Sequence, residues 1–194
     1  NEISGDTIIA ICANYMKQKK ILKNNVVVTT VMSNLGLSEL FNNLNIIHYK
    51  SQVGDRYVIS EMLKYDAALG GEDSGHIIFA NYHTTGDGIL SALQLLSIMR
   101  ESGAPLSELA KIMKIYPQKL INIEVREKKN LEEIKEIDDA IKKSEKELGT
   151  SGRLLVRYSG TQNMCRVMVE APTNEITEKI ANRIADLIKQ YLGG

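Results

Sequence analysis

The sequence predicts an α/β unit with a mixed sheet, followed by a smaller α+β unit. Two observations predict this. Up to about residue 115, short apolar runs alternate with segments of helical periodicity, which is typical of an α/β layer with mainly parallel strands. From residue 118 the order becomes strand, helix, strand, strand, helix. With 43% hydrophobic residues in 194, a core can form in each unit.

The elements of the first unit follow from the spacing of apolar residues. Residues 6–17 have near-helical spacing, with Asp6 as the first candidate for the N-cap and Ser4 as the second. A helix opens at residues 84–88, capped by Asp87, and ends near residue 101. Apolar residues go most of the way round it, so we expect it to be buried on several sides. Other helices are expected at 36–44, 57–64 and 106–113, and strands at 26–31, at 46–49 and on both sides of residues 70–75.

The second unit begins with alternating apolar and polar residues, which predicts a half-exposed strand near residues 121–125. A charged helix with one apolar face follows at residues 131–148. Two short strands then flank a polar loop. The last helix carries an apolar face and is capped near Thr173 or Asn174.

Composition argues against a general nucleic-acid binder and against a membrane-spanning protein. Lys+Arg and Asp+Glu number 24 each, and a zero net charge argues against a general nucleic-acid binder. No apolar run approaches the roughly 20 residues of a membrane span. Cys12 and Cys165 lie far apart and have no metal-ligand spacing, so we expect buried thiols of a cytoplasmic protein. The chain opens on Asn1 and not on Met, and we expect it to come from inside a larger protein.

The polar loop between residues 157 and 166 is a candidate phosphate site. Arg157 and Arg166 offer forked N–H donors that match phosphate oxygens. Ser159 and Thr161 add hydroxyl donors, and Gly160 allows backbone N–H groups to approach closely. The alternative is a polar hairpin whose arginines pair with surface carboxylates, and composition does not decide between the two.

Residues 71–76 form a second candidate site. On an extended segment Glu72, Ser74 and His76 would project to one side, where a carboxylate and nearby donors suit sugar hydroxyls. The same alternation would point Asp73 away from Glu72, so we expect Asp73 to have little effect on the candidate sugar site. Ser74 does not lie in a Gly-x-Ser-x-Gly motif, which argues against a nucleophile. The residues alone favour a glycine-rich turn with a structural histidine.

Taken together, these motifs resemble the α-D-phosphohexomutase family. They occur in one order along nearly the whole chain, which is far more specific than any single motif. The resemblance implies the end of the second domain (residues 1–24), an α/β sugar-binding third domain (25–117) and an α+β phosphate-binding C-terminal domain (118–194). The matching segments are residues 29–34 (TTVMSN), 53–58 (VGDRYV), 70–79 (GGEDSGHIIF), 84–88 (TTGDG) and 152–170.

The resemblance also assigns roles to residues. It implies sugar binding by Glu72, Ser74, His76, Asp55 and Arg56, and phosphate binding by Arg157, Ser159, Gly160, Thr161 and Arg166. In the family the nucleophilic serine, which carries a phosphoryl group, belongs to the first domain. The aspartate-rich Mg²⁺ loop would lie just upstream of Asn1. We therefore expect no catalytic nucleophile and no metal ligand in this chain, and no activity of the chain alone.

The implied reaction interconverts glucosamine 6-phosphate and glucosamine 1-phosphate, a step toward amino-sugar nucleotides and the peptidoglycan precursor. It implies Mg²⁺ in the full-length enzyme, a hexosamine or glucose 1,6-bisphosphate as activator or intermediate, and a homodimer. The expected partner is a small sugar phosphate, with no nucleic acid and no membrane. Two alternatives stay open: a phosphoglucomutase or phosphomannomutase, and a non-catalytic sugar-phosphate binding module.

The sequence departs from the family in the 157–166 loop. Most members have Pro after the first arginine and Glu-Pro after the threonine, where this chain has Tyr158, Gln162 and Asn163. Losing two prolines makes the free loop less rigid. Replacing a carboxylate by Gln162 removes a charge that would repel a bound phosphate.

Overall fold

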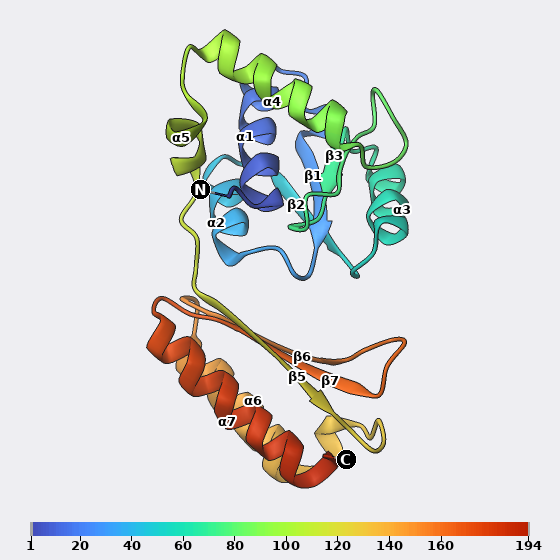
Figure 1. The fold of residues 1–194 in the computed structure, drawn as a ribbon, viewed down its shortest axis with the longest axis vertical. Coiled ribbons are helices and arrows are strands. Elements are labelled where there is room, and N and C mark those ends of the chain that lie inside the picture. Colours follow the sequence, from blue (N-terminus) through green and yellow to red (C-terminus); the bar gives the residue numbers. More distant parts are fainter. Residues whose placement is uncertain (1, 194) are drawn as a thin grey trace. The chain divides into compact units, whose positions relative to one another are not determined.

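The computed structural model describes residues 2–193, which divide into two compact units (Figure 1). Unit 1 ends at Ile115 and unit 2 begins at Tyr116. Unit 1 is an α/β layer with a mixed sheet. Unit 2 has the order strand, helix, strand, strand, helix, apart from one short 3₁₀ turn. The predicted fold class is confirmed.

Two of the sequence predictions reach beyond this part of the chain. Asn1, the first residue of the segment assigned to a preceding domain, lies outside the described residues, as does Gly194 at the other end. The metal loop expected just upstream of Asn1 also lies outside them, so its position stays a prediction.

The sheet of unit 1 has the order β2-β1-β3-β4. The central strand β1 is buried along its whole length, as its run of β-branched residues predicts. Strands β2 and β3 both run parallel to β1, and β4 returns antiparallel to β3. The carboxyl ends of β1, β2 and β3 therefore lie at one edge of the sheet. The bounds are β1 Val26–Thr30, β2 Ile47–Ser51, β3 Leu69–Gly71 and β4 Ile77–Phe79.

Helices cover both faces of this sheet (Figure 1). The larger core lies on one face, where α1, α2 and α4 pack on side chains such as Val27, Leu69 and Ile77. The helix α3 packs on the other face through Val58 and Met62. The bounds are α1 Gly5–Gln18, α2 Leu35–Asn43, α3 Asp55–Tyr65, α4 Gly88–Ser102 and α5 Leu106–Leu109, with 3₁₀ turns at Lys23–Asn25 and Ala110–Ile112.

Two features of α1 differ from the sequence analysis. Ser4, the second choice, is the N-cap, because its hydroxyl accepts a hydrogen bond from the Thr7 N–H at 3.3 Å. Asp6 is instead fully buried and bonds elsewhere. Residues 1–24 were assigned to the tail of a preceding domain, whereas α1 supplies much of the larger core of unit 1.

The expectation that α4 is buried on several sides is wrong for the described residues. Asp87 caps the helix as predicted, accepting from the Leu90 N–H at 2.9 Å. Only one side of α4 reaches the core, mainly through Leu95 and Ile98. Apolar side chains on the other side are exposed: Ile89 by 77%, Leu93 by 59% and Leu96 by 56%.

Unit 2 is an antiparallel sheet of order β5-β7-β6 with both helices on one face (Figure 1). Its core combines Ile123, Val167 and Val169 of the sheet with Ile180 and Ile184 of the last helix. That helix begins after Thr173, which accepts from the Ile176 N–H, so the predicted cap is confirmed. The bounds are β5 Gln118–Glu124, a 3₁₀ turn Leu131–Glu133, α6 Lys135–Leu148, β6 Arg153–Tyr158, β7 Met164–Glu170 and α7 Asn174–Leu192.

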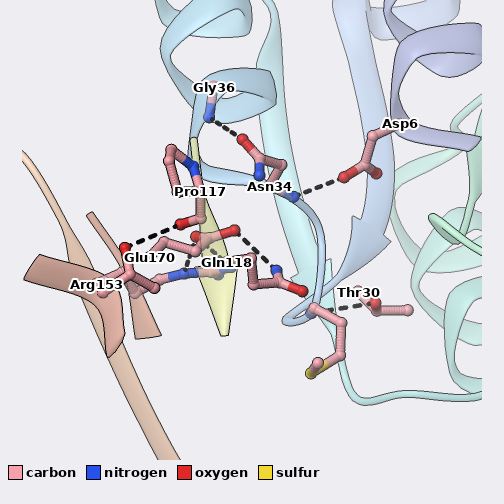
Figure 2. A network of polar contacts seen from close by, with 10 residues as sticks. Asp6, Thr30, Asn34, Gly36, Pro117, Gln118, Arg153 and Glu170 are labelled. Carbon is pink, nitrogen blue, oxygen red and sulfur yellow. Dashed lines mark hydrogen bonds and ion pairs between the residues drawn. The ribbon is translucent and has the colours of Figure 1, made fainter. Parts of the chain in front are cut away.

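The face of this sheet opposite the helices carries a buried ionic row. Glu170 lies in register with Gln118 on one side and Arg153 on the other. Its fully buried carboxylate accepts from Gln118 Nε2 at 2.9 Å and from Arg153 Nε at 2.8 Å (Figure 2). The row thus joins all three strands at the end of the sheet where β5 begins.

Each unit buries one cysteine in its core, Cys12 in unit 1 and Cys165 in unit 2. Burial raises the pKa of the Cys12 thiol to about 12 and that of Cys165 to about 11. Both side chains therefore behave as small apolar groups, as the sequence analysis expected.

Candidate functional site

The candidate sugar residues of unit 1 lie on loops at the carboxyl edge of its parallel strands. Residues 31–34 follow β1, residues 52–54 follow β2 and residues 72–76 follow β3. Ligands of open α/β sheets bind outside this edge because the loops converge there. Side chains and backbone groups of these loops also bond to one another.

Glu72 connects the loop after β3 to the loop after β2. Its carboxylate Oε1 accepts a hydrogen bond from the Gly54 N–H at 2.9 Å. Gly54 has φ of 126° at the start of α3, a backbone conformation that favours glycine. A carboxylate has about four acceptor positions, so this bond leaves capacity for other donors such as sugar hydroxyls. The bond to Gly54 therefore orients the carboxylate and still leaves acceptor positions for a ligand.

Residues 72–76 form a tight turn, so the expectation of an extended segment is wrong. The Gly75 N–H donates to the Glu72 carbonyl at 3.0 Å, and the Glu72 N–H donates to the His76 carbonyl at 3.0 Å. Gly75 has φ of 91°, which closes the turn. Ser74 lies at its exposed tip. The turn agrees with the interpretation that the residues alone favoured, a glycine-rich turn.

The N-terminus of α1 supports this turn. The Gly5 N–H donates to the Asp73 carbonyl at 2.9 Å, and the Asp6 N–H donates to Asp73 Oδ1 at 3.3 Å. A Cβ on Gly5 would collide with the Glu72 carbonyl and lie 2.7 Å from the Asp73 carbonyl oxygen, so only glycine fits. The expectation that Asp73 has little effect is wrong, because its side chain helps to dock the turn on α1.

Asp6 joins the same helix end to the loop after β1. Its Oδ2 accepts from the Asn34 N–H at 2.6 Å, and Asn34 in turn caps α2 by accepting from the Gly36 N–H at 3.1 Å (Figure 2). The start of α1 therefore contacts two of the loops at the carboxyl edge. No local pattern in the sequence indicates these contacts, because they join residues far apart in the chain.

His76 at the end of the turn lies beside Asp55 at the start of α3. Their closest atoms, His76 Nε2 and Asp55 Oδ2, are 3.7 Å apart. Gly86 packs against the imidazole ring, since a Cβ there would lie 2.6 Å from three ring atoms. Arg56 is directed elsewhere, with its guanidinium over the Tyr57 ring and 2.5 Å from the Tyr57 hydroxyl. The structure thus brings Asp55 to His76 but holds Arg56 on its own helix.

The candidate phosphate residues of unit 2 centre on two arginines. Arg157 of β6 and Arg166 of β7 are paired in register, on the sheet face opposite the helices. Burial, and then the neighbouring Arg166 charge, lower the pKa of the Arg157 guanidinium, which remains charged at neutral pH. The buried Arg166 Nε has no hydrogen-bond partner among the described residues. Two adjacent like charges with an unused buried donor favour an anion.

The 159–163 loop connects these two strands. Ser159 is buried, whereas Gly160 and Thr161 are exposed. The Ser159 N–H donates to the Met164 carbonyl at 2.8 Å, which closes the hairpin. The loop therefore presents Gly160 and Thr161 to solvent next to the arginine pair, and holds Ser159 inside.

The described residues contain no group of three or more His, Cys, Asp or Glu that fits a metal ion. None of the helices at residues 2–193 has the length and apolar character that crossing a membrane requires.

Family models match both units. The model of phosphoglucomutase/phosphomannomutase α/β/α domain III matches residues 4–116, more than half of the 194. The model of the C-terminal domain of the same proteins matches residues 120–187. The chain belongs to the phosphoglucomutase/phosphomannomutase family. The resemblance seen in the sequence motifs is confirmed.

Curated relatives in this family match along the whole chain. A phosphoglucosamine mutase of Syntrophus aciditrophicus is 53% identical over 193 residues, covering 100% of this chain and 43% of the relative. That of Halalkalibacterium halodurans is 50% identical over 193 residues, again 43% of the relative. The chain thus spans less than half the length of these phosphoglucomutase/phosphomannomutase family members.

Solved structures of phosphohexomutases share the fold. An Aspergillus fumigatus N-acetylphosphoglucosamine mutase in complex with glucose 1,6-bisphosphate has a TM-score of 0.79 at 19% identity, covering 98% of this chain and 44% of that one. The same fungal enzyme with GlcNAc-6P and magnesium gives a TM-score of 0.77 at 18% identity, covering 96% and 44%. At these identities the comparison shows the family fold alone.

Proposed function

We propose that this chain is the sugar- and phosphate-recognition part of a phosphoglucosamine mutase, an isomerase that interconverts glucosamine 6-phosphate and glucosamine 1-phosphate. The observation that carries the proposal is 53% identity over 193 residues to a phosphoglucosamine mutase. Full length, the enzyme would act in the cytoplasm as a homodimer in amino-sugar and cell-wall precursor synthesis. The chain alone would bind substrate without converting it.

Unit 1 would recognise the sugar hydroxyls through Glu72. Its bond to Gly54 fixes the carboxylate at the carboxyl edge of the sheet, with acceptor capacity left over. A hexose turned end for end exchanges its 3- and 4-hydroxyls, so one acceptor can serve both substrate orientations. Ser74 and His76 would line the same loop, with Asp55 orienting His76, and Arg56 would join them by leaving the Tyr57 ring.

Unit 2 would hold the phosphate of the sugar. Arg157 and Arg166 would supply charged N–H donors, with the exposed backbone of Gly160 and the hydroxyl of Thr161 beside them. Ser159 would contribute only after its hydroxyl turns outward, because the residue is buried. Phosphoryl transfer depends mainly on positioning and charge stabilisation, so a recognition part of this kind has a large influence on rate.

The phosphoryl donor and the metal would lie outside these 194 residues, the metal loop just upstream of Asn1. Mg²⁺ neutralises charge on a transferring phosphoryl group when it is bound. The described residues contain no group of three or more His, Cys, Asp or Glu that could hold it. A hexosamine or glucose 1,6-bisphosphate would be the intermediate that turns between the two phosphorylation states.

The proposal is tested with the purified chain and with the complete protein encoded by its gene. The chain should bind glucosamine 6-phosphate in calorimetry without turnover, and the complete protein should convert it, followed by ³¹P NMR. Turnover by the chain alone would contradict the division of roles. Faster conversion of glucose or mannose phosphates would identify a phosphoglucomutase or phosphomannomutase. Binding by a complete protein that lacks a serine loop and an aspartate-rich loop would indicate a non-catalytic binding module.

A further inference from the structure

The segment that follows β5 makes three hydrogen bonds with the 159–163 loop and the residue before it. The Val125 N–H donates to the Asn163 carbonyl at 2.9 Å. Lys128 Nζ donates to the Ser159 carbonyl at 2.7 Å, and the Tyr158 hydroxyl donates to the Lys129 carbonyl at 2.6 Å. The ends of the loop, and the residue before it, are therefore bonded to residues 125–129.

Tyr158 is the last residue of β6 and directly precedes the loop. Its ring packs against the core of unit 2, and its hydroxyl donates to the Lys129 carbonyl. Burial, and then the neighbouring Cys165 and Glu127 side chains, raise the pKa of this phenol, so it stays protonated and able to donate at neutral pH.

Lys128 bonds to the first residue of the loop. Its ammonium holds the carbonyl of the buried Ser159, and a charged donor makes a stronger hydrogen bond than a neutral one. Fixing this carbonyl also fixes the direction of the Gly160 N–H, because both belong to the same planar peptide group. The Lys129 side chain, by contrast, pairs with Glu127 at 2.8 Å.

We propose that Lys128 and Tyr158 are positioning residues for the phosphate loop. Their hydrogen bonds with groups far away in the sequence hold the first residue of the loop and the residue before it. The inference rests on the proposed function, because it assigns the loop a phosphate. A loop that is already ordered loses less conformational entropy on binding, so its affinity for the anion is higher. Releasing either contact should weaken phosphate binding without removing any phosphate-contacting group.

The test uses two pairs of matched variants of the 194-residue chain. Tyr158→Phe removes one hydroxyl and keeps the ring, and Tyr191→Phe makes the same change on α7. Lys128→Met removes the loop contact and one charge, and Lys129→Met removes the same charge without a loop contact. Inorganic phosphate is titrated by NMR. Tyr158→Phe and Lys128→Met should bind roughly three- to ten-fold more weakly, and both controls should stay within about two-fold of the unchanged chain.

Amide hydrogen exchange of residues 159–163 gives a readout that does not depend on phosphate. Exchange should be faster in Tyr158→Phe and Lys128→Met than in the unchanged chain, and unchanged in both controls. All four variants should reach half-unfolding at the same urea concentration as the unchanged chain, so that a change in exchange reflects the loop and not overall stability. Lys128→Arg keeps a charged donor and should restore both affinity and protection. Equal losses of phosphate affinity in Lys128→Met and Lys129→Met would show that the effect comes from the lost charge alone, and would overturn the proposal. Unchanged exchange in Tyr158→Phe would overturn it too. If the unchanged chain binds no phosphate while the exchange pattern holds, the proposed function of the loop fails and its positioning stands.

Discussion

Among single residues, Glu72 combines a structural bond with its proposed role as sugar acceptor. One carboxylate oxygen holds the Gly54 N–H, so the side chain is oriented before any ligand arrives. Replacing Glu72 therefore has two separable consequences. Glutamine keeps an acceptor for Gly54 and loses the charge, whereas alanine loses both.

Glu72→Ala in the complete protein should weaken binding of glucosamine 6-phosphate and of glucosamine 1-phosphate alike. Losing hydrogen bonds to a charged group costs roughly 1.5–3 kcal/mol, about ten-fold or more in affinity. Glu72→Gln should weaken both by less. Dissociation constants are the measurement, because the equilibrium between the two sugar phosphates fixes the ratio of the forward and reverse kcat/KM values.

The control for this prediction is Glu61→Gln. Glu61 is a carboxylate on α3 that pairs with Lys64 at 3.2 Å. Its replacement by glutamine should leave the affinities for both sugar phosphates unchanged. A Glu72→Ala variant that binds one of the two sugar phosphates normally would contradict the idea of a shared acceptor.

At this scale the sequence analysis identified candidate residues but did not predict their contacts. Glu72, His76 and Asp55 were named from their chemistry and the motif resemblance, and the structure places all three at the carboxyl edge of unit 1. Gly5 and Asp73 were missed as a pair. Their contact joins residues far apart in the chain, and neither residue type indicates a partner in advance. Only the fold brings them together.

Between elements, the start of α1 is a support for the 72–76 turn. Gly5→Ala should destabilise the chain by roughly 1–3 kcal/mol, because the added methyl group must displace the turn. The same shift should weaken sugar-phosphate binding, since Glu72 belongs to the turn. Urea unfolding and calorimetry measure the two effects.

Gly88→Ala is the matched control for Gly5→Ala. Gly88 opens α4, and a Cβ there would meet nothing within 4 Å. Alanine should be neutral or stabilise the helix by up to about 1 kcal/mol. Equal effects of the two substitutions would show that the contact between α1 and the turn is unimportant.

The buried row of unit 2 gives a second prediction about elements. Glu170→Ala removes the carboxylate that joins β5, β6 and β7, and leaves Arg153 largely buried without this partner. Breaking a buried ion pair on one side costs roughly 3–5 kcal/mol. Urea unfolding of unit 2 should show a loss of that size.

Glu178→Ala provides the comparison for this row. Glu178 approaches Lys119 at 3.9 Å with both side chains exposed. Such surface pairs contribute about 0–1 kcal/mol, so this variant should unfold close to the unchanged chain. Similar losses for both variants would mean that burial of the row contributes little.

The order and caps of the helices and strands were predicted better than the contacts that cover their apolar faces. The helix and strand order followed from apolar periodicity, and Asp87 and Thr173 were correctly identified as caps. The exposure of Ile89, Leu93 and Leu96 on α4 was not foreseen, because periodicity reports which faces are apolar and not what covers them. The glycines of residues 72–76 correctly favoured a turn, whereas the alternation argument for the candidate sugar site assumed an extended segment.

For the whole molecule, two compact units on one chain raise the question of whether they unfold together. Each unit has its own hydrophobic core, built from different elements. Local opening in proteins often follows such units. A probe in each core can therefore follow each unit separately.

The two cysteines supply these probes without any substitution. Their raised pKa values leave very little thiolate at neutral pH, and burial blocks access, so neither should react with a thiol reagent in the folded chain. In urea, Cys12 should be modified when unit 1 opens and Cys165 when unit 2 opens. Peptide mass spectrometry after brief labelling distinguishes the two sites. Rapid modification of either cysteine without denaturant would contradict the burial.

The time course of this labelling also records an order of events. If one cysteine gains the label while the other remains protected, the chain passes through a form with one unit folded. If both gain it at the same rate at every urea concentration, the units unfold as one. Because each core contains one thiol, the sequence itself provides a separate reporter of unfolding for each unit.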